Sequence, residues 1–178
     1  MLASGDGFTK PREKHSFIGL PSVTIAAAVA KDKVIMWHVV EGTWNGAAAA
    51  DMYKNYLKPA LEATWGKQRR HTIVEDGDRK GNRSGKGIAA KASAGIFATC
   101  LPPRTPSLMP LDYSIWNEIV KKVASQKKYK KETKTEFLER LQNAAMTLKK
   151  GYVKSVIARM RPNIKALADA KGFVPRND

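Results

Sequence analysis

Residues 101–116 read L-P-P-R-T-P-S-L-M-P-L-D-Y-S-I-W, and the fold of the chain is best derived outward from this stretch. Proline fixes φ and lacks a backbone N–H, so four prolines in ten residues predict a turn. Apolar residues then recur at steps of three and four over residues 111–123, which predicts a helix. The turn therefore places one carboxylate, Asp112, at the start of a helix.

A second carboxylate follows a predicted strand earlier in the chain. Residues 71–75 (H-T-I-V-E) are β-prone and run into the acidic sequence E-D-G-D at residues 75–78. Another predicted strand, residues 96–101, leads into the proline turn. If these two strands lie side by side, Asp76 and Asp112 reach the same edge of the sheet. Clustered acids of this kind hold divalent metals, although acids at strand ends and helix starts also serve as simple caps.

The remaining periodicities predict an α/β fold. Two apolar runs, at residues 22–30 and 34–40, are joined by a short polar turn and indicate a β-hairpin. A helix is expected over residues 47–65 with a kink at Pro59, and a short helix over residues 88–94 that ends at Gly95. Strands that alternate with helices after a hairpin indicate a layered fold with a mixed sheet.

Two further helices are expected towards the C-terminus. Thr133 and Glu136 form a capping-box pattern, and Glu136 and Arg140 are spaced as a helical ion pair. A last helix follows Gly151, and Pro162 is expected to bend or break it.

The composition indicates a polyanionic partner. The 178 residues carry a net charge of +16, and 43% of them are hydrophobic, which is enough for a folded core. Residues 121–178 hold 16 basic and 5 acidic residues, so most of the excess charge lies there. Lysine and arginine gain free energy by displacing counterions from phosphates, and DNA or RNA fits this balance. No signal peptide or membrane span is apparent, and the only cysteine, Cys100, is expected to be a small buried residue in a reducing compartment.

Basic side chains beside the acidic stretches are candidates for contacts with the nucleic-acid backbone. The glycine-rich segment 77–87 is predicted to be a loop, and its cations could position a phosphate strand or simply lie in solvent. The candidate residues are Arg79, Lys80, Arg83, Lys86, Arg104, Lys121, Lys122, Lys127 and Lys128.

Several segments together resemble the mariner-superfamily transposases. Residues 105–119 (T-P-S-L-M-P-L-D-Y-S-I-W-N-E-I) are similar to that family's S-P-D-L-N-P-L-D-Y-x-x-W signature, and I-V-E-D-G-D at residues 73–78 is similar to its acidic strand end. The 35 residues between Asp76 and Asp112 are close to the family's spacing. The hairpin with V-V-E-G-T-W-N-G (residues 39–46) and the segment 162–172 also resemble family sequence. Ser107, Met109 and Arg79 depart from the family pattern.

The resemblance implies a ribonuclease H-like mixed sheet flanked by helices, with a helical C-terminal extension. The chain would then have three segments: an irregular N-terminal segment (residues 1–21), a partial core (residues 22–126) and a basic helical extension (residues 127–178). Asp76 and Asp112 would be the second and third catalytic acids, and Asp78 a further metal ligand for Mg²⁺ or Mn²⁺. The resemblance also implies that the partner is DNA, that the assembly is a homodimer and that the protein is located in the nucleus.

The family's first acid has no clear counterpart in this sequence. It belongs on a strand before the hairpin, where Asp6 is the sole aspartate and lies outside any apolar run. We therefore expect a DNA-binding remnant or fragment of a transposase catalytic domain that is inactive as this chain. The alternatives are a non-catalytic basic nucleic-acid-binding protein and a ribonuclease H-like nuclease or resolvase.

Overall fold

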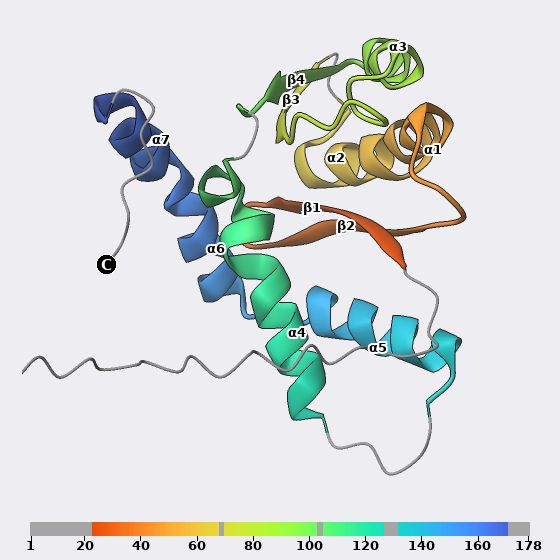
Figure 1. Cartoon of the computed structure of the whole chain (residues 1–178), viewed down its shortest axis with the longest axis vertical. Helices are drawn as coiled ribbons and strands as arrows, with labels where there is room; N and C mark the ends of the chain where they lie inside the picture. The colour runs from red at the N-terminus through yellow and green to blue at the C-terminus, as the bar shows by residue number, and fades with distance from the viewer. Residues whose placement is uncertain (1–22, 68–69, 103–104, 127–131, 171–178) are drawn as a thin grey trace, which may run out of the picture.

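The strands form two separate pairs in the computed structural model, which describes residues 23–67, 70–102, 105–126 and 132–170. β1 (Thr24–Ala30) and β2 (Lys33–Val40) make the expected antiparallel hairpin. β3 (His71–Glu75) and β4 (Ile96–Cys100) pair in parallel, as required for Asp76 and Asp112 to approach one edge. The mixed sheet is therefore present as two two-stranded sheets (Figure 1).

The helical segment after the hairpin covers the expected residues but contains a wider turn. α1 (Gly46–Asp51), η1 (Met52–Leu57) and α2 (Lys58–Trp65) follow one another without a break. Asn45 caps the start, since its side-chain oxygen accepts from the backbone N–H of Ala47 at 2.8 Å. η1 is a π-helical turn immediately before Pro59. A proline ring crowds the preceding turn and supplies no N–H, and the wider turn accommodates both effects.

The helix between β3 and β4 starts earlier than the sequence predicts. α3 spans Gly85–Ala94, so the expected start at Ile88 is wrong by three residues. The hydroxyl oxygen of Ser84 accepts from the backbone N–H of Gly87 at 3.0 Å and caps the helix. This cap offsets the poor helix propensity of the two glycines. Gly95 ends the helix in the left-handed conformation with φ of 68°, as expected.

The second half of the chain is helical. It contains η2 (Pro106–Leu108), η3 (Leu111–Ile115), α4 (Trp116–Ser125), α5 (Lys134–Met146), α6 (Lys150–Ala158) and α7 (Met160–Asp169). The capping box of Thr133 and Glu136 is confirmed. The predicted pairing of Glu136 with Arg140 is wrong, because Glu136 is turned back to the cap and Arg140 binds Glu132 at 2.6 Å. The break between α6 and α7 lies just before Pro162, as expected.

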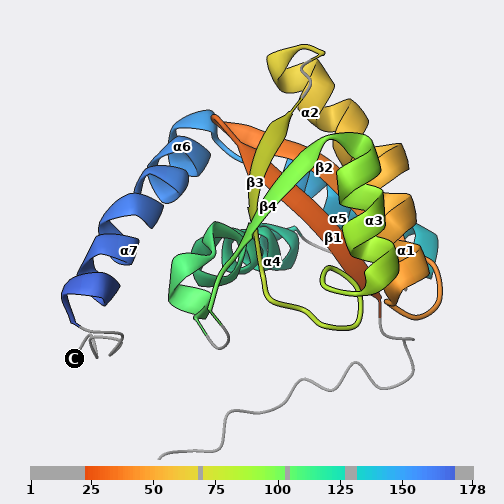
Figure 2. The same cartoon turned by 90° about the horizontal axis from the view of Figure 1, so that it is seen from above.

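Two apolar cores lie on opposite faces of the hairpin. Met36 packs with Tyr53, Leu57 and other side chains from η1, α2 and α3 on one face. On the other face Val34 packs with α4, α5 and α6 (Figures 1 and 2). The C-terminal helices therefore share a core with the hairpin. Among the described helices, none is both long and apolar enough to cross a membrane.

One expectation about a single side chain is wrong. Cys100 is exposed, because β4 ends at the surface and its last two residues are both exposed. Trp65, at the end of α2, is also 41% exposed, and the ammonium group of Lys31 lies over its ring, 5.5 Å from the ring centre.

Candidate active site

Asp76 and Asp112 are brought to one edge by the parallel pairing of β3 and β4. Glu75 is the last residue of β3 and lies opposite Cys100, the last residue of β4. The backbone N–H of Leu101 donates to the Glu75 carbonyl at 2.9 Å and extends the ladder by one bond. Both strands therefore end together, and the chain after each enters the same region, as is general for parallel strands.

Asp112 is positioned by the proline turn. Pro110 precedes η3, and the backbone N–H of Asp112 donates to the Met109 carbonyl at 2.9 Å, which fixes the start of the helix. η3 is a second π-helical turn, closed by the N–H of Trp116 on the Leu111 carbonyl. Turns of this type often occur at functional sites because they re-aim single side chains.

Asp76 and Asp112 line the same cavity of about 570 Å³, and the charge of Asp76 acts on Asp112. Partial removal from water raises the pKa of Asp112, the charge of Asp76 raises it further, and the Trp116 hydrogen bond partly opposes them. Partial burial raises the pKa of Asp76, and the charges of Asp78 and Glu75 raise it further. The hydrogen bonds that Asp76 accepts lower the pKa but do not cancel this increase. Two carboxylates that repel one another in this way are an arrangement that a bound cation would stabilise.

Asp78 lines the same cavity, but its oxygens are already used. One oxygen accepts from the indole N–H of Trp44 at 2.8 Å and from the backbone N–H of Gly81 at 2.6 Å. Burial raises the pKa of Asp78, but these hydrogen bonds outweigh it and the net pKa lies below the usual value. Gly81 packs so closely on the Trp44 ring that a Cβ would lie 2.3 Å from the indole nitrogen. Asp78 thus shapes the loop after β3, and its role as a metal ligand stays a prediction.

A chain of buried polar side chains lies behind Asp76. The Asn82 amide donates to Asp76 at 2.5 Å, and its carbonyl oxygen lies 3.0 Å from the Tyr53 hydroxyl. That hydroxyl also lies 2.5 Å from Glu75, which forms an ion pair with Lys91. Tyr53 has one proton for its two acceptors, and burial together with the Glu75 hydrogen bond raises its pKa, so it stays protonated. The Asn82 amide thus ties the Asp76 carboxylate to this buried network.

Sequence reasoning missed this network. Tyr53 lies in a segment expected only to be a helix, and Asn82 and Lys91 lie in segments expected to be a loop and a short helix. One signal was present, because a lysine within an apolar run is expected to be paired when it is buried. Lys91 is 7% exposed. The partner of that lysine was not apparent from spacing, since Glu75 lies 16 residues earlier.

The donor set fits a divalent cation such as Mg²⁺ or Mn²⁺. Both ions prefer hard oxygen ligands and keep several waters, so a pair of carboxylates is a sufficient protein contribution. Across residues 23–67, 70–102, 105–126 and 132–170, no three histidine, cysteine or acidic side chains gather closely enough to form a larger ligand set. The acids that would hold the ion are Asp76 and Asp112.

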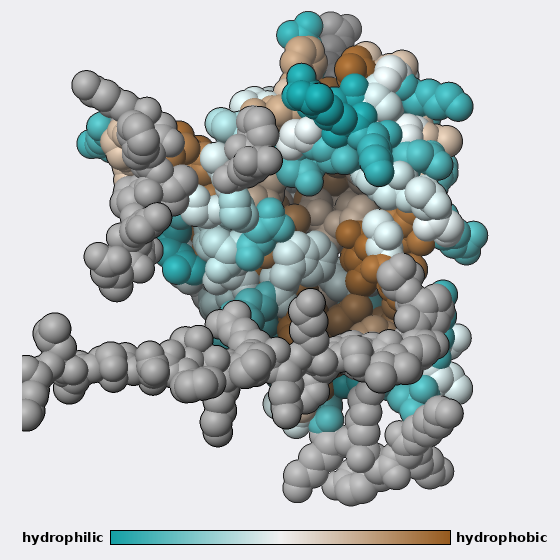
Figure 3. All heavy atoms as spheres, in the orientation of Figure 1, coloured by the Kyte–Doolittle hydropathy of each residue, from teal (hydrophilic) through white to brown (hydrophobic). Residues whose placement is uncertain are grey.

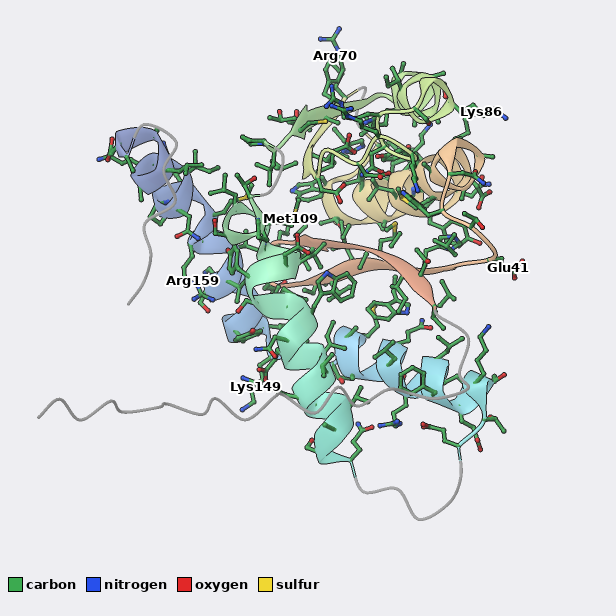
Figure 4. All side chains as sticks on the ribbon, viewed as in Figure 1. Glu41, Arg70, Lys86, Met109, Lys149 and Arg159 are labelled. Carbon is green, nitrogen blue, oxygen red and sulfur yellow. The ribbon has the colours of Figure 1, made fainter. Side chains whose placement is uncertain are left out.

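The predicted DNA-contacting residues that the structure describes lie in the turn after β3, on α3 and on α4. Arg79, Lys80 and Arg83 are exposed in the turn between β3 and α3, close to Asp78. Lys86 is exposed on α3 and points outward, away from Met109 beside η3 (Figure 4).

The two α4 lysines also lie apart from the carboxylates. Lys121 lies nine residues beyond Asp112, which is roughly 14 Å along the helix. Lys122 donates to the Thr147 carbonyl and hydroxyl, both at 2.7 Å, and so helps to close α5. Arg104, Lys127 and Lys128 lie outside the described residues.

Comparison with known proteins gives a match in structure alone. No family model matches the sequence, and the comparison with curated proteins found no match. Among solved structures, the catalytic domain of the Mos1 mariner transposase superposes with a TM-score of 0.72, at 14% identity over 84% of this chain and 74% of that chain. The chain has the fold of the Mos1 catalytic domain. The ribonuclease H-like fold expected from the sequence is thereby confirmed.

Other structures of the same transposase agree. Its catalytic domain with raltegravir and manganese gives a TM-score of 0.72 at 13% identity, over 85% of this chain and 76% of that chain. Mos1 in a paired-end complex with the left transposon end gives a TM-score of 0.72 at 13% identity. That match covers 97% of this chain but 52% of the other, so this chain spans about half the length of that transposase.

Neutralising Asp112 is expected to stabilise the protein at neutral pH. Folding raises the pKa of Asp112, so the folded state binds the proton more tightly than the unfolded chain does. Its contribution to stability is present below the ordinary pKa of 3.8 and is lost as the pH rises through the raised pKa. Asp112→Asn should therefore raise Tm at neutral pH, and the gain should shrink as the pH falls toward 3.8. A pH-independent difference in thermal unfolding would contradict this assignment.

Proposed function

We propose that this chain is a DNA-binding protein built on a mariner-transposase catalytic fold, and that Asp76 and Asp112 hold one divalent cation beside the bound DNA. The observation that carries the proposal is the convergence of these two carboxylates on one cavity, where the charge of Asp76 raises the pKa of Asp112. Mg²⁺ or Mn²⁺ bound there would neutralise the carboxylates and polarise a phosphate oxygen.

DNA is the proposed partner because of charge as well as fold. Folding does not require a net charge, and the net charge of +16 favours association with the phosphates of a nucleic acid. Arg79, Lys80 and Arg83 lie in the turn that Asp78 shapes, so they can contact a strand whose phosphate lies near Asp76. In Mos1 the same fold occurs in paired-end complexes with transposon DNA. Pairing of two copies of this chain on DNA, and a nuclear location, belong to the same proposal.

We further propose that the described part of the chain does not complete strand cleavage. Two-metal phosphoryl transfer needs acids around both ions, and no three histidine, cysteine or acidic side chains gather closely enough to hold an ion within the residues described. Binding of DNA and of one cation is the activity that this arrangement supports.

Mobility-shift and nicking assays on the same duplex test the proposal. We expect binding without metal, with an affinity that falls steeply as salt rises. With Mg²⁺ or Mn²⁺ we expect no cleavage above that of the Asp76→Asn and Asp112→Asn variants. Cleavage of duplex DNA that both variants lose would identify a working transposase-type nuclease. Cleavage confined to branched or RNA–DNA hybrid substrates would favour a resolvase or ribonuclease, and absence of DNA binding would contradict the proposal.

Asn82→Ala should weaken the proposed cation site without removing a ligand. The Asn82 amide holds one Asp76 oxygen at 2.5 Å, so its loss frees the carboxylate to rotate. Loss of a residue that orients a metal ligand lowers metal affinity about 10–100-fold. Mn²⁺ titration would measure this loss. Asn55→Ala is the matched control, because Asn55 is an exposed asparagine whose amide donates to Asp51, one turn earlier in the same helical segment. Equal affinities in the two variants would show that Asn82 does not position Asp76.

A further inference from the structure

Four basic side chains form a line along the two C-terminal helices, and we call them the basic stripe. They are Lys150 and Lys154 on α6 and Arg161 and Lys165 on α7. The two residues of each pair are one helical turn apart and therefore share one side of their helix. Arg159, between the helices, keeps helical dihedral angles (φ −68°, ψ −18°), and the step from Lys154 to Arg161 is close to two helical turns. The line on α6 therefore continues onto α7.

The basic stripe lies on the solvent side of both helices, and all four of its side chains are exposed. The inner side of α6 packs in the core through Val153 and Val156, which are fully buried. On the inner side of α7, Met160 lines the cavity that Asp76 and Asp112 share. Figures 1 and 2 show α7 projecting from one side of the molecule, and Figure 3 shows hydrophilic side chains beside α6. The stripe is therefore accessible to a large partner and is turned away from the cavity.

The charges of the stripe oppose the stability of the helices that carry them. Like charges one turn apart repel one another and destabilise a helix. Lys150 is also the first residue of α6, where the partial positive charge of the helix start disfavours a cation. Residues 141–168 hold six basic residues and no acidic one, and Asp169, one turn after Lys165, marks the end of the line. An anionic partner along the stripe would remove this repulsion.

Hydrogen bonds attach both helices to the turn that carries Asp112. The Tyr113 hydroxyl donates to the Val156 carbonyl of α6. The Asn163 amide of α7 donates to the Ser107 carbonyl of η2 at 3.0 Å. The stripe is therefore held in place before a partner arrives, and less ordering is required on binding.

We infer that the basic stripe binds the phosphate backbone of duplex DNA, at a surface separate from the cation site. The inference rests on the DNA binding proposed above and specifies where a duplex is held. From Lys150 to Lys165 the helices extend roughly 20 Å, which is the axial length of about six base pairs. The residues beside the cations are small and exposed, so a phosphate strand can approach closely: Gly151, Ser155, Ala158, Pro162 and Ala166.

The stripe fits a duplex better than a single strand. Proteins that hold single strands stack the bases on aromatic rings. Tyr152 is the only aromatic residue between residues 141 and 168, and it is half-buried with its hydroxyl 2.9 Å from the Ser114 hydroxyl. The stripe therefore offers positive charge to a backbone and no surface for stacking bases.

The salt dependence of duplex binding by the full chain tests this inference. The probe is a DNA duplex of about 20 base pairs, about three times the length of the stripe. The stripe variant combines Lys150→Gln, Lys154→Gln, Arg161→Gln and Lys165→Gln. Its slope of log K against log salt should be shallower by about 3–4, because each phosphate contact contributes about 0.9. Its Kd at low salt should rise at least about tenfold.

Two control variants separate the stripe from net charge and from shape. Lys33→Gln, Lys54→Gln, Lys67→Gln and Lys134→Gln together remove the same charge from exposed positions elsewhere and should change the slope by less than about 1. Exchange of lysine and arginine at the four stripe positions keeps the charge and should keep the slope. The stripe variant should also bind Mn²⁺ as the wild type does.

Four results would overturn the inference. An unchanged slope in the stripe variant, with a wild type that binds the duplex, would overturn it and leave the proposed function standing. Equal losses in the stripe variant and the charge-matched control would show that net charge alone drives binding. If the stripe variant lost binding to phosphatidylserine vesicles and kept its duplex affinity, the stripe would be a membrane-binding surface. A wild type that binds no duplex would overturn the proposed function and this inference with it.

Discussion

Lys91→Ala is expected to lower the free energy of unfolding by about 3–5 kcal/mol, the usual cost of leaving one member of a buried ion pair without its partner. Lys91 and Glu75 are both 7% exposed and bind one another directly. Removal of the ammonium group leaves the Glu75 carboxylate buried beside Tyr53 without the ion pair that offsets its desolvation. The Lys91 ammonium also lies 5.2 Å from the Tyr53 ring centre, so this contact is lost as well.

Urea denaturation would measure the effect against two controls. Lys86→Ala changes an exposed lysine on the same helix and should stay within about 0.5 kcal/mol of the wild type. The double variant Lys91→Met with Glu75→Gln removes both charges and should recover most of the loss. If Lys91→Ala were no more destabilising than Lys86→Ala, the buried pair would not contribute to the fold.

Ile115→Ala should lower the free energy of unfolding by about 2–5 kcal/mol. Ile115 is fully buried in η3, between the hairpin and the C-terminal helices, and packs in the core that contains Val34 and Val156. Truncation leaves a cavity beneath the turn that carries Asp112, three residues away. We therefore expect weaker cation binding together with lower stability.

Val120→Ala provides the matched control. Val120 lies on α4, the continuation of the same helix, but is 60% exposed. Its truncation should change the stability by no more than about 0.5 kcal/mol. Thermal and urea unfolding of the two variants measure the difference directly. Similar losses in both would show that the core is not organised around η3.

The hairpin, the β3–β4 pair and the acids after them could be predicted from sequence because local signals determine them. Apolar β-prone runs, the prolines around residues 102–110 and the capping box of Thr133 each depend on a few neighbouring residues. The parallel pairing that brings Asp76 and Asp112 together required one assumption, that consecutive strands are neighbours, and this assumption holds.

The features that could not be predicted depend on residues far apart in sequence. The contact of Asn82 with Tyr53 joins positions 29 residues apart, and no periodicity signals it. The start of α3 at Gly85 depends on the Ser84 cap, which outweighs a composition typical of loops. The division of the described strands into two separate pairs is also non-local, and the sequence of neither strand reveals it.

Titration of the full chain with Mn²⁺ tests the central claim most directly, because it measures whether Asp76 and Asp112 act together. The wild type should bind one ion, and Asp76→Asn and Asp112→Asn should each weaken binding by at least about tenfold. Asp51→Asn, at an exposed position on α1, should bind as the wild type does. Unchanged Mn²⁺ affinity in Asp76→Asn and Asp112→Asn would contradict the assignment of these two carboxylates as a cation site.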